Sequence, residues 1–202
     1  MNSLAVSPTN PEVLLAGIEV GAVMRSDDRG KTWSKHRRGS DRDCHSLKFH
    51  NEDGNWAYQG GGGGVSYSTD GGRSWKKPKA GLGLKYGWMV SADPERPDIW
   101  YLTASERPNL LKGQFHPLAH IDGQAQGHIY RKIGGGPWQQ LSGGLPEPLD
   151  YMAFDLAVVP GKTGQLYAGL ANGQIWQTDD YGENWDHLPI DFGGIHHSMI
   201  VM

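Results

Sequence analysis

Short apolar runs separated by polar turns recur along the whole chain. The runs are rich in Val, Ile, Leu, Tyr and Trp, and the turns are rich in Gly, Pro, Asn and Asp. This alternation is typical of short β-strands joined by tight turns. No segment keeps a 3.6-residue period for long enough to indicate a helix. The pattern therefore predicts an all-β protein.

One motif of the form S/T-x-D-x-G-x-x-W closes several of these units. Intact copies end at Trp33, Trp75 and Trp185, and a copy that has lost its aspartate ends at Trp138. The aspartate of such a turn can accept backbone N–H bonds, the glycine permits positive φ, and the tryptophan can cover the sheet. Three similar copies favour a structural role over a calcium loop or a catalytic aspartate. The residues concerned are Ser26, Asp28, Gly30, Trp33, Ser68, Asp70, Gly72, Trp75, Thr178, Asp180, Gly182 and Trp185.

The motif and its spacing resemble a known family. The turns are similar to Asp-box (BNR) repeats, and the whole chain resembles bacterial sialidase-like, WD40/YVTN/BNR-like propellers of the glycosyl hydrolase type. Two of the three tryptophan spacings lie near the ~40–45 residues of a four-stranded propeller blade, and the longer third spacing indicates an insertion. The resemblance implies a single propeller domain with blades at about 1–40, 41–83, 84–147 and 148–190, and a final strand at 195–202. It does not specify a reaction, because sialidases, xyloglucan hydrolases, sorting receptors and photosystem assembly factors share such propellers.

Four blades and one strand suggest the C-terminal part of a larger propeller. The alternative is a compact ring of five blades in which one blade is skeletal. An open row of blades would leave edges without partners, so we expect a tendency to self-associate.

Composition narrows the classes of partner. The 202 residues include 19 Lys and Arg against 22 Asp and Glu, a net charge of −3, which argues against a basic nucleic-acid-binding surface. One cysteine, Cys44, excludes an intramolecular disulfide and a cysteine-based zinc site, and we expect its thiol to be buried and inert. The chain has no apolar run of membrane-spanning length and no signal-peptide pattern. We therefore predict no nucleic-acid or membrane partner, and the cytoplasm is the favoured compartment.

The resemblance also indicates where a ligand would bind. In sialidase-like propellers the ligand funnel lies opposite the Asp-boxes, close to the segments that precede each innermost strand. In this chain those segments are polar and aromatic, which favours a small polar or carbohydrate-like ligand. The alternative is the solvated rim that any propeller has. The candidate ligand-binding residues are Arg42, His45, Tyr86, Trp88, Tyr151 and His197.

Glycoside hydrolysis would require a pair of carboxyl groups roughly 5–10 Å apart. The candidates are Glu19, Asp43, Asp150 and Asp155. Asp155 interrupts an apolar strand, so it is either a buried acid or a cap for backbone amides. The Phe/Tyr-Arg-Ile-Pro motif of sialidases is missing, so we do not expect sialidase activity. Three functions stay open: a ligand-binding propeller, a glycoside hydrolase, or a protein-interaction scaffold of the assembly-factor type.

The connection over residues 104–127 is longer than ordinary loops, which favours a functional segment. We expect a lid over the funnel that carries Leu110, Leu111 and Phe115. His116, His120 and Asp122 would hold a metal ion only if the segment were helical. Without a helix signal, we predict neither a metal nor another cofactor.

Overall fold

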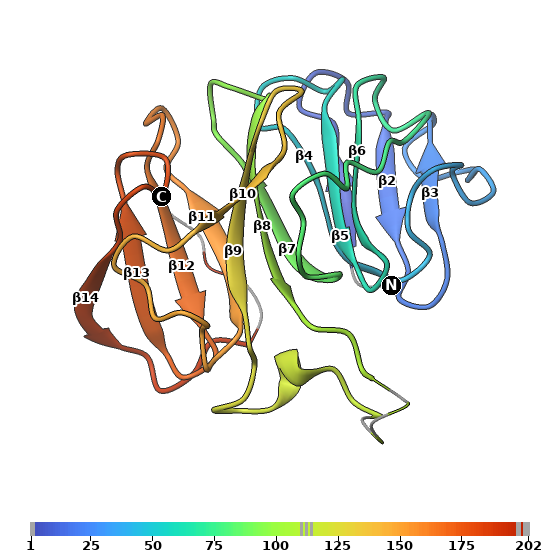
Figure 1. Ribbon diagram of the computed structural model, residues 1–202. Coiled ribbons are helices and arrows are strands. Elements are labelled where there is room, and N and C mark those ends of the chain that lie inside the picture. Colours follow the sequence, from blue (N-terminus) through green and yellow to red (C-terminus); the bar gives the residue numbers. More distant parts are fainter. Residues whose placement is uncertain (1–2, 110, 112, 114, 197–198, 200–202) are drawn as a thin grey trace.

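The computed structural model describes residues 3–109, 111, 113, 115–196 and 199, and it is built from four antiparallel sheets that stand side by side in chain order (Figure 1). The first sheet contains β1 (Ser3–Val6), β2 (Leu14–Gly17) and β3 (Val23–Ser26), and the second contains β4 (Cys44–Phe49), β5 (Ala57–Gly61) and β6 (Gly64–Ser68). The third contains β7 (Tyr86–Ala92), β8 (Ile99–Ser105), β9 (His128–Ile133) and β10 (Trp138–Leu141). The fourth contains β11 (Ala153–Val158), β12 (Leu166–Leu170), β13 (Gln174–Thr178) and β14 (Asp186–Asp191).

The innermost strand of each sheet packs on that of the next. β1 contacts β4, β4 contacts β7, and β7 contacts β11. Apolar side chains fill the space between successive sheets: Leu15, Leu47, Phe49 and Trp75 between the first pair, Tyr58, Val90, Trp100 and Leu102 between the second, and Met89, Tyr101, Leu156 and Leu166 between the third. The predicted all-β propeller architecture is confirmed, because hairpin-connected sheets packed face to face in chain order are propeller blades.

The outer edges of the sheets differ. The third and fourth sheets have the four strands expected of a blade, whereas the first two have three strands and an irregular outer segment. In the first sheet, Ser34 and Arg37 donate backbone hydrogen bonds to β3, and in the second, Lys76 forms an isolated bridge with Tyr67. Pro78 supplies no N–H there, so this edge cannot continue as a regular ladder.

Two further expectations concern the two ends of the chain. Leu4 and Val6 of β1 are about half exposed, and self-association through this edge stays a prediction. Most of the final strand expected at 195–202 lies outside the described residues; within it, the Ile195 N–H donates to the Ala171 carbonyl at 3.3 Å. Among the described residues, no helix has the length and apolar character needed to cross a membrane.

The three intact Asp-box turns share one hydrogen-bond scheme. In the first, Asp28 Oδ1 accepts from the Thr32 N–H at 2.8 Å, and Asp28 Oδ2 accepts from the Thr32 hydroxyl at 2.6 Å. Ser26 Oγ accepts the Gly30 N–H at 2.8 Å, and the Trp33 indole donates to the Gly30 carbonyl at 3.0 Å. The second and third boxes repeat these contacts with their own residues. The glycines have φ of +83°, +83° and +91°, values that only glycine adopts without strain.

In the copy that lost its aspartate, a hydrogen-bond donor holds the turn in place of an acceptor. Lys132, at the end of β9, donates through its ammonium group to the carbonyls of Gly134 and Gly136. A cation that donates to carbonyls therefore holds the turn that an aspartate holds elsewhere. Arg131 reaches across to the third intact box, where it contacts the Tyr181 carbonyl at 3.0 Å and the Glu183 carboxylate at 2.6 Å.

Candidate functional site at the inner strand ends

The strand register places the boxes and the starts of the innermost strands at opposite ends of each sheet. In the second sheet, Phe49 pairs with Ala57, which pairs with Ser68 of the box. At the other end, Cys44 pairs with Gly61, which pairs with Gly64. The end that carries Cys44 is called the mouth below, and it is the end at which the sequence predicts a ligand.

Three innermost strands are interrupted by a β-bulge at the mouth. The register shifts between Cys44 and Ser46, between Gly87 and Val90, and between Ala153 and Asp155. The residues at these shifts include His45 on β4, Trp88 on β7 and Phe154 on β11. A bulge leaves a residue outside the ladder and redirects its side chain, which is a frequent device next to binding sites.

The three bulge side chains form one continuous aromatic cluster. The ring centroids of His45 and Trp88 are 4.6 Å apart, and those of Trp88 and Phe154 are 5.2 Å apart. Tyr86 lies 4.8 Å from His45, and His196 lies 6.1 Å from Phe154. The predicted ligand-binding residues His45, Tyr86 and Trp88 therefore come together. Phe154 was missed, although it occupies the same place relative to its strand as His45 and Trp88.

Serine hydroxyls join innermost strands to one another around the bulge of β4. Ser46 Oγ donates to the Trp88 carbonyl at 2.6 Å and accepts the Val90 N–H at 3.1 Å, and Ser3 Oγ donates to the His45 carbonyl at 3.4 Å. Asp155 takes the corresponding position on β11. It is almost fully buried, and its carboxylate accepts the N–H groups of Leu156, at 2.9 Å, and of Met199. These contacts match the backbone-capping alternative for Asp155.

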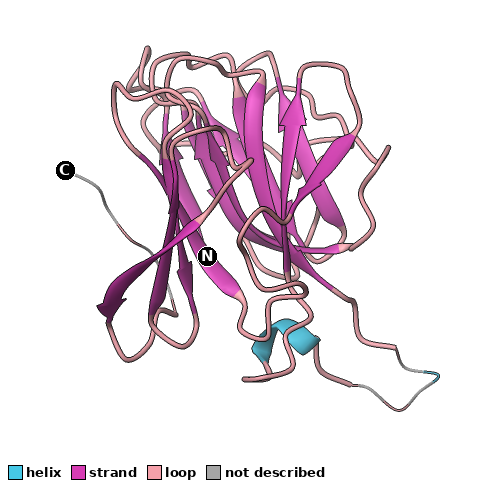
Figure 2. Ribbon diagram, turned by 60° about the vertical axis from the view of Figure 1, so that its left-hand side comes forward, coloured by secondary structure: helices cyan, strands magenta, loops and turns pink. Residues whose placement is uncertain are grey.

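The 104–127 connection reaches the aromatic cluster through His120. Its described part projects from the mouth end of the sheets in Figures 1 and 2 and includes the short 3₁₀ helix η2 (Leu118–His120). The Tyr86 hydroxyl lies 3.0 Å from His120 Nε2, and the His120 ring lies 4.9 Å from that of Trp88. Burial raises the pKa of Tyr86 and lowers that of His120, so the hydrogen bond joins an uncharged phenol and an uncharged imidazole.

The lid expectation needs correction in its details. Leu111 is fully exposed and Phe115 is three-quarters exposed, so neither covers the cluster, and Leu110 lies outside the described residues. The covering residues are His120 and the buried Ala119, because the Tyr86–His120 contact holds the connection near η2 and not at its tip. Among the described residues, His116, His120 and Asp122 do not form a group that could hold a metal ion.

A cavity of about 580 Å³ opens beside the cluster. Its polar lining consists of Glu19, His45, Lys48 and His196 together with serines of β1 and β4, and its apolar lining includes Trp88, Met89 and Leu47. Lys48 Nζ lies 3.9 Å from the buried Asp155 carboxylate. A volume of this size with few convergent polar groups is typical of small-molecule sites.

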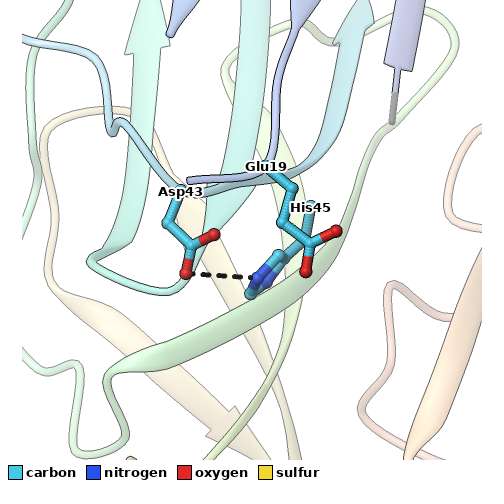
Figure 3. Close-up of side chains that lie close together, drawn as sticks. All are labelled: Glu19, Asp43 and His45. Carbon is cyan, nitrogen blue, oxygen red and sulfur yellow. Dashed lines mark ion pairs between the residues drawn. The ribbon is translucent and has the colours of Figure 1, made fainter. Parts of the chain in front are cut away.

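Two of the candidate carboxylates lie close together beside His45, as Figure 3 shows, and one of them, Glu19, lines this cavity. Glu19, in the turn between β2 and β3, and Asp43, just before β4, have oxygens within 4.8 Å of one another and of a His45 ring nitrogen. Asp43 Oδ2 lies 3.5 Å from His45 Nε2, and Asp43 Oδ1 accepts the Val20 N–H at 3.1 Å. The contact to Val20 ties the first blade to the second at this point.

The structure does not bring the other candidates into this cavity. Arg42 is exposed and donates to the Gly21 carbonyl at 3.2 Å, while Asp150 is exposed beside the long connection. Tyr151 is partly buried and packs against the same two apolar clusters as Trp88. His197 lies outside the described residues. Cys44 is fully buried, and burial raises the pKa of its thiol to about 12, which fits the expected inert role.

The comparison with protein families decides the nature of the repeat. The family described as BNR/Asp-box repeat matches residues 24–35 and 66–77, which are the first two boxes. The chain carries BNR/Asp-box repeats. The third box, at Thr178–Trp185, has the same hydrogen bonds without being matched.

Solved structures share the arrangement of the blades. An ancestral GH74 enzyme matches with a TM-score of 0.69 and 16% identity over 93% of this chain and 24% of that chain. The GH74 xyloglucanase from Xanthomonas campestris matches with a TM-score of 0.67 and 25% identity over 92% of this chain and 29% of that chain. A structure of YCF48 bound to D1 peptide matches with a TM-score of 0.54 and 15% identity over 93% of this chain and 53% of that chain. This BNR-repeat chain thus spans about a quarter of the GH74 chains. No curated protein matches it.

Proposed function

We propose that this BNR-repeat propeller binds a carbohydrate in the cavity at its mouth. The observation that carries the proposal is the half-buried Trp88 ring at the wall of a cavity that also presents Glu19, His45 and Lys48. An apolar ring face combined with a few charged hydrogen-bonding groups suits a ligand with both apolar C–H faces and hydroxyl groups. The likeness to a GH74 xyloglucanase supports xyloglucan oligosaccharides as the first ligands to test.

Calorimetric titration of the full chain with xyloglucan and cello-oligosaccharides tests this proposal. We expect Trp88→Ala to weaken binding at least tenfold, about 1.4 kcal/mol. Phe192→Ala is the matched control, because Phe192 is an exposed aromatic residue that does not line the cavity. Lys48→Gln tests the polar side of the cavity in case Trp88→Ala perturbs the fold. Equal affinity in the wild type, Trp88→Ala and Lys48→Gln would contradict the proposal.

Glycoside hydrolysis is a second candidate, and the Glu19–Asp43 pair favours it. Retaining glycosidases hold their two carboxyl groups about 5–5.5 Å apart, and these two carboxylates approach to within 4.8 Å at the edge of the same cavity. A panel of aryl-glycosides tests it: turnover that disappears in both Glu19→Gln and Asp43→Asn supports catalysis. Binding of oligosaccharides without turnover supports the ligand-binding function alone. Protein partners that are retained by both variants would instead favour a scaffold.

A further inference from the structure

Three side chains with metal-binding atoms lie together, as Figure 3 shows, and two of them, Glu19 and His45, line the cavity. Glu19 comes from the first blade, whereas Asp43 and His45 come from the second. One oxygen or nitrogen from each lies within 4.8 Å of the other two. Among the described residues, no other group of three His, Cys, Asp or Glu comes this close. The cluster combines residues that are distant in the chain, since the β2–β3 turn reaches across to the start of β4.

The tautomer of His45 is fixed by its surroundings. Its Nδ1 lies 2.7 Å from the Gly87 carbonyl oxygen, which can only accept, so Nδ1 carries the hydrogen. In the neutral ring, Nε2 then presents a lone pair toward the Asp43 carboxylate. The His45 side chain is only 1% exposed, so water has little access to it. A carbonyl on the far ring nitrogen is the arrangement that orients metal-binding histidines.

The distances fit a cation better than a direct hydrogen bond. Asp43 Oδ2 and His45 Nε2 are 3.5 Å apart, whereas direct N–H···O bonds are usually about 2.7–3.2 Å long. A tetrahedral zinc ion about 2.0–2.2 Å from each ligand atom holds two of them about 3.4 Å apart. Glu19 has an exposed side chain and contributes the third ligand atom, an oxygen within 4.8 Å of the other two.

The second oxygen of Asp43 organises the cluster. Asp43 Oδ1 accepts the Val20 N–H at 3.1 Å, which leaves Oδ2 directed at His45. Val20 follows Glu19 directly, so this bond also fixes the turn that carries Glu19. The backbone of Val20 has a φ of +48°, which is rare for a β-branched residue. The contact with Asp43 therefore holds a strained turn in the position that places Glu19 beside His45.

We propose that Glu19, Asp43 and His45 bind a divalent transition-metal ion, with Zn²⁺ as the preferred ion. One imidazole nitrogen and two carboxylate oxygens form a donor set that zinc accepts. Three protein ligands leave the fourth tetrahedral position for water or for a ligand group. Glu19 and His45 both line the cavity, so a group in that position lies at the cavity wall.

Metal binding by the chelator-treated full chain tests this proposal without any carbohydrate. Equilibrium dialysis against Zn²⁺, with metal determined by mass spectrometry, is expected to give one ion per chain. Glu19→Gln and His45→Gln are each expected to weaken binding at least tenfold. His116→Gln is the matched control, because His116 is an exposed histidine outside the cluster and should bind as the wild type does. Co²⁺ added in place of Zn²⁺ should give visible absorption that His45→Gln removes.

Several outcomes would overturn the zinc site. Unchanged Zn²⁺ affinity in Glu19→Gln or His45→Gln would exclude these ligands, as would a loss in His116→Gln of the same size. Ca²⁺ bound as tightly as Zn²⁺ would exclude a role for the imidazole, since Ca²⁺ takes oxygen ligands. Glu19→Gln is the decisive variant, because Glu19 is exposed and its replacement should leave the fold unchanged. Circular dichroism checks this. Failure of carbohydrate binding leaves this result unaffected, since the metal is the only ligand added.

Discussion

The Asp-box turns at one end of the sheets repeat their side chains, whereas the bulged strand starts at the other end repeat only their backbone. Each intact box has the same aspartate, glycine and tryptophan with the same hydrogen bonds. The three bulges carry His45, Trp88 and Phe154, which differ in size and polarity. Identical side chains indicate a shared structural task, and different side chains on the same frame indicate a site.

The largest effect is expected from a box tryptophan. Trp75 is 6% exposed and packs among the apolar residues between the first two sheets, so Trp75→Ala should cost about 3–5 kcal/mol of unfolding free energy. Trp33 holds the same position in the first box but is 37% exposed, and Trp33→Ala should cost clearly less. Urea denaturation measures both. Equal losses would show that the turn itself, and not burial, is what the tryptophan stabilises.

A box glycine should have the next largest effect. Gly72 has a φ of +83°, and an added Cβ would lie 2.5 Å from Leu15 Cδ2. Gly72→Ala should therefore destabilise the fold by about 2 kcal/mol, through the left-handed backbone and the contact together. Gly135→Ala is the control, since no heavy atom lies within 4 Å of its added Cβ and its turn is not an intact box. Thermal denaturation of the two variants should separate them; a Gly72→Ala protein as stable as the control would contradict the steric account.

The box carboxylates should give a smaller, pH-dependent effect. Hydrogen bonds from the Thr32 hydroxyl and backbone lower the pKa of Asp28 from 3.8 to about 2. As the pH falls, the unfolded chain takes up its proton first, so this contribution is present above about pH 4 and is lost toward pH 2. Urea midpoints between pH 6 and pH 2 should fall less steeply for Asp28→Asn than for the wild type. Asp122→Asn, an exposed carboxyl outside the boxes, should keep the wild-type slope; a matching change there would remove the assignment to the box.

The smallest effect is expected at the mouth, from His120→Ala. This change removes the hydrogen bond with the Tyr86 hydroxyl and the ring contact with Trp88, both at a partly exposed position. The global stability should change by less than about 1 kcal/mol. Amide exchange over residues 118–127 should become faster, while exchange in β4 and β7 stays as it is. Unchanged exchange in 118–127 would show that Ala119 and Ala125 alone hold the connection in place.

The sequence predicts most of the scaffold because the repeat is local. The box motif and the short apolar runs predict turns and strands from neighbouring residues alone, within each blade. The mouth depends on contacts that strand alternation does not encode. A regular strand would direct His45 and Ser46 to opposite sides, but the bulge changes this alternation, and the Gly87 carbonyl that fixes the His45 ring belongs to the next blade.

Two other features of the mouth could not be predicted from the sequence pattern, namely the approach of Glu19 to Asp43 and the position of His120. Glu19 and Asp43 were each candidates, but their approach depends on the β2–β3 turn being tied to Asp43 through Val20. Phe154 was identifiable in principle, because aligning the innermost strands places it in one column with His45 and Trp88. His120 had no such signal, since it comes from an insertion that only one blade contains.

The hydrogen bonds that Ser46 makes to β7, just after the bulge of β4, have a consequence for protein engineering. Ser46 joins β4 to the Trp88 carbonyl and the Val90 N–H of β7, so the side chain at 88 is not part of these bonds, whereas His45 adds a bond of its own to the Gly87 carbonyl. The side chain at 88 can therefore be exchanged without removing a hydrogen bond between β4 and β7. A library at 88 would vary a side chain at the cavity wall while leaving the bonds between β4 and β7 and the Asp-boxes unaltered, so new specificities could be selected on this framework.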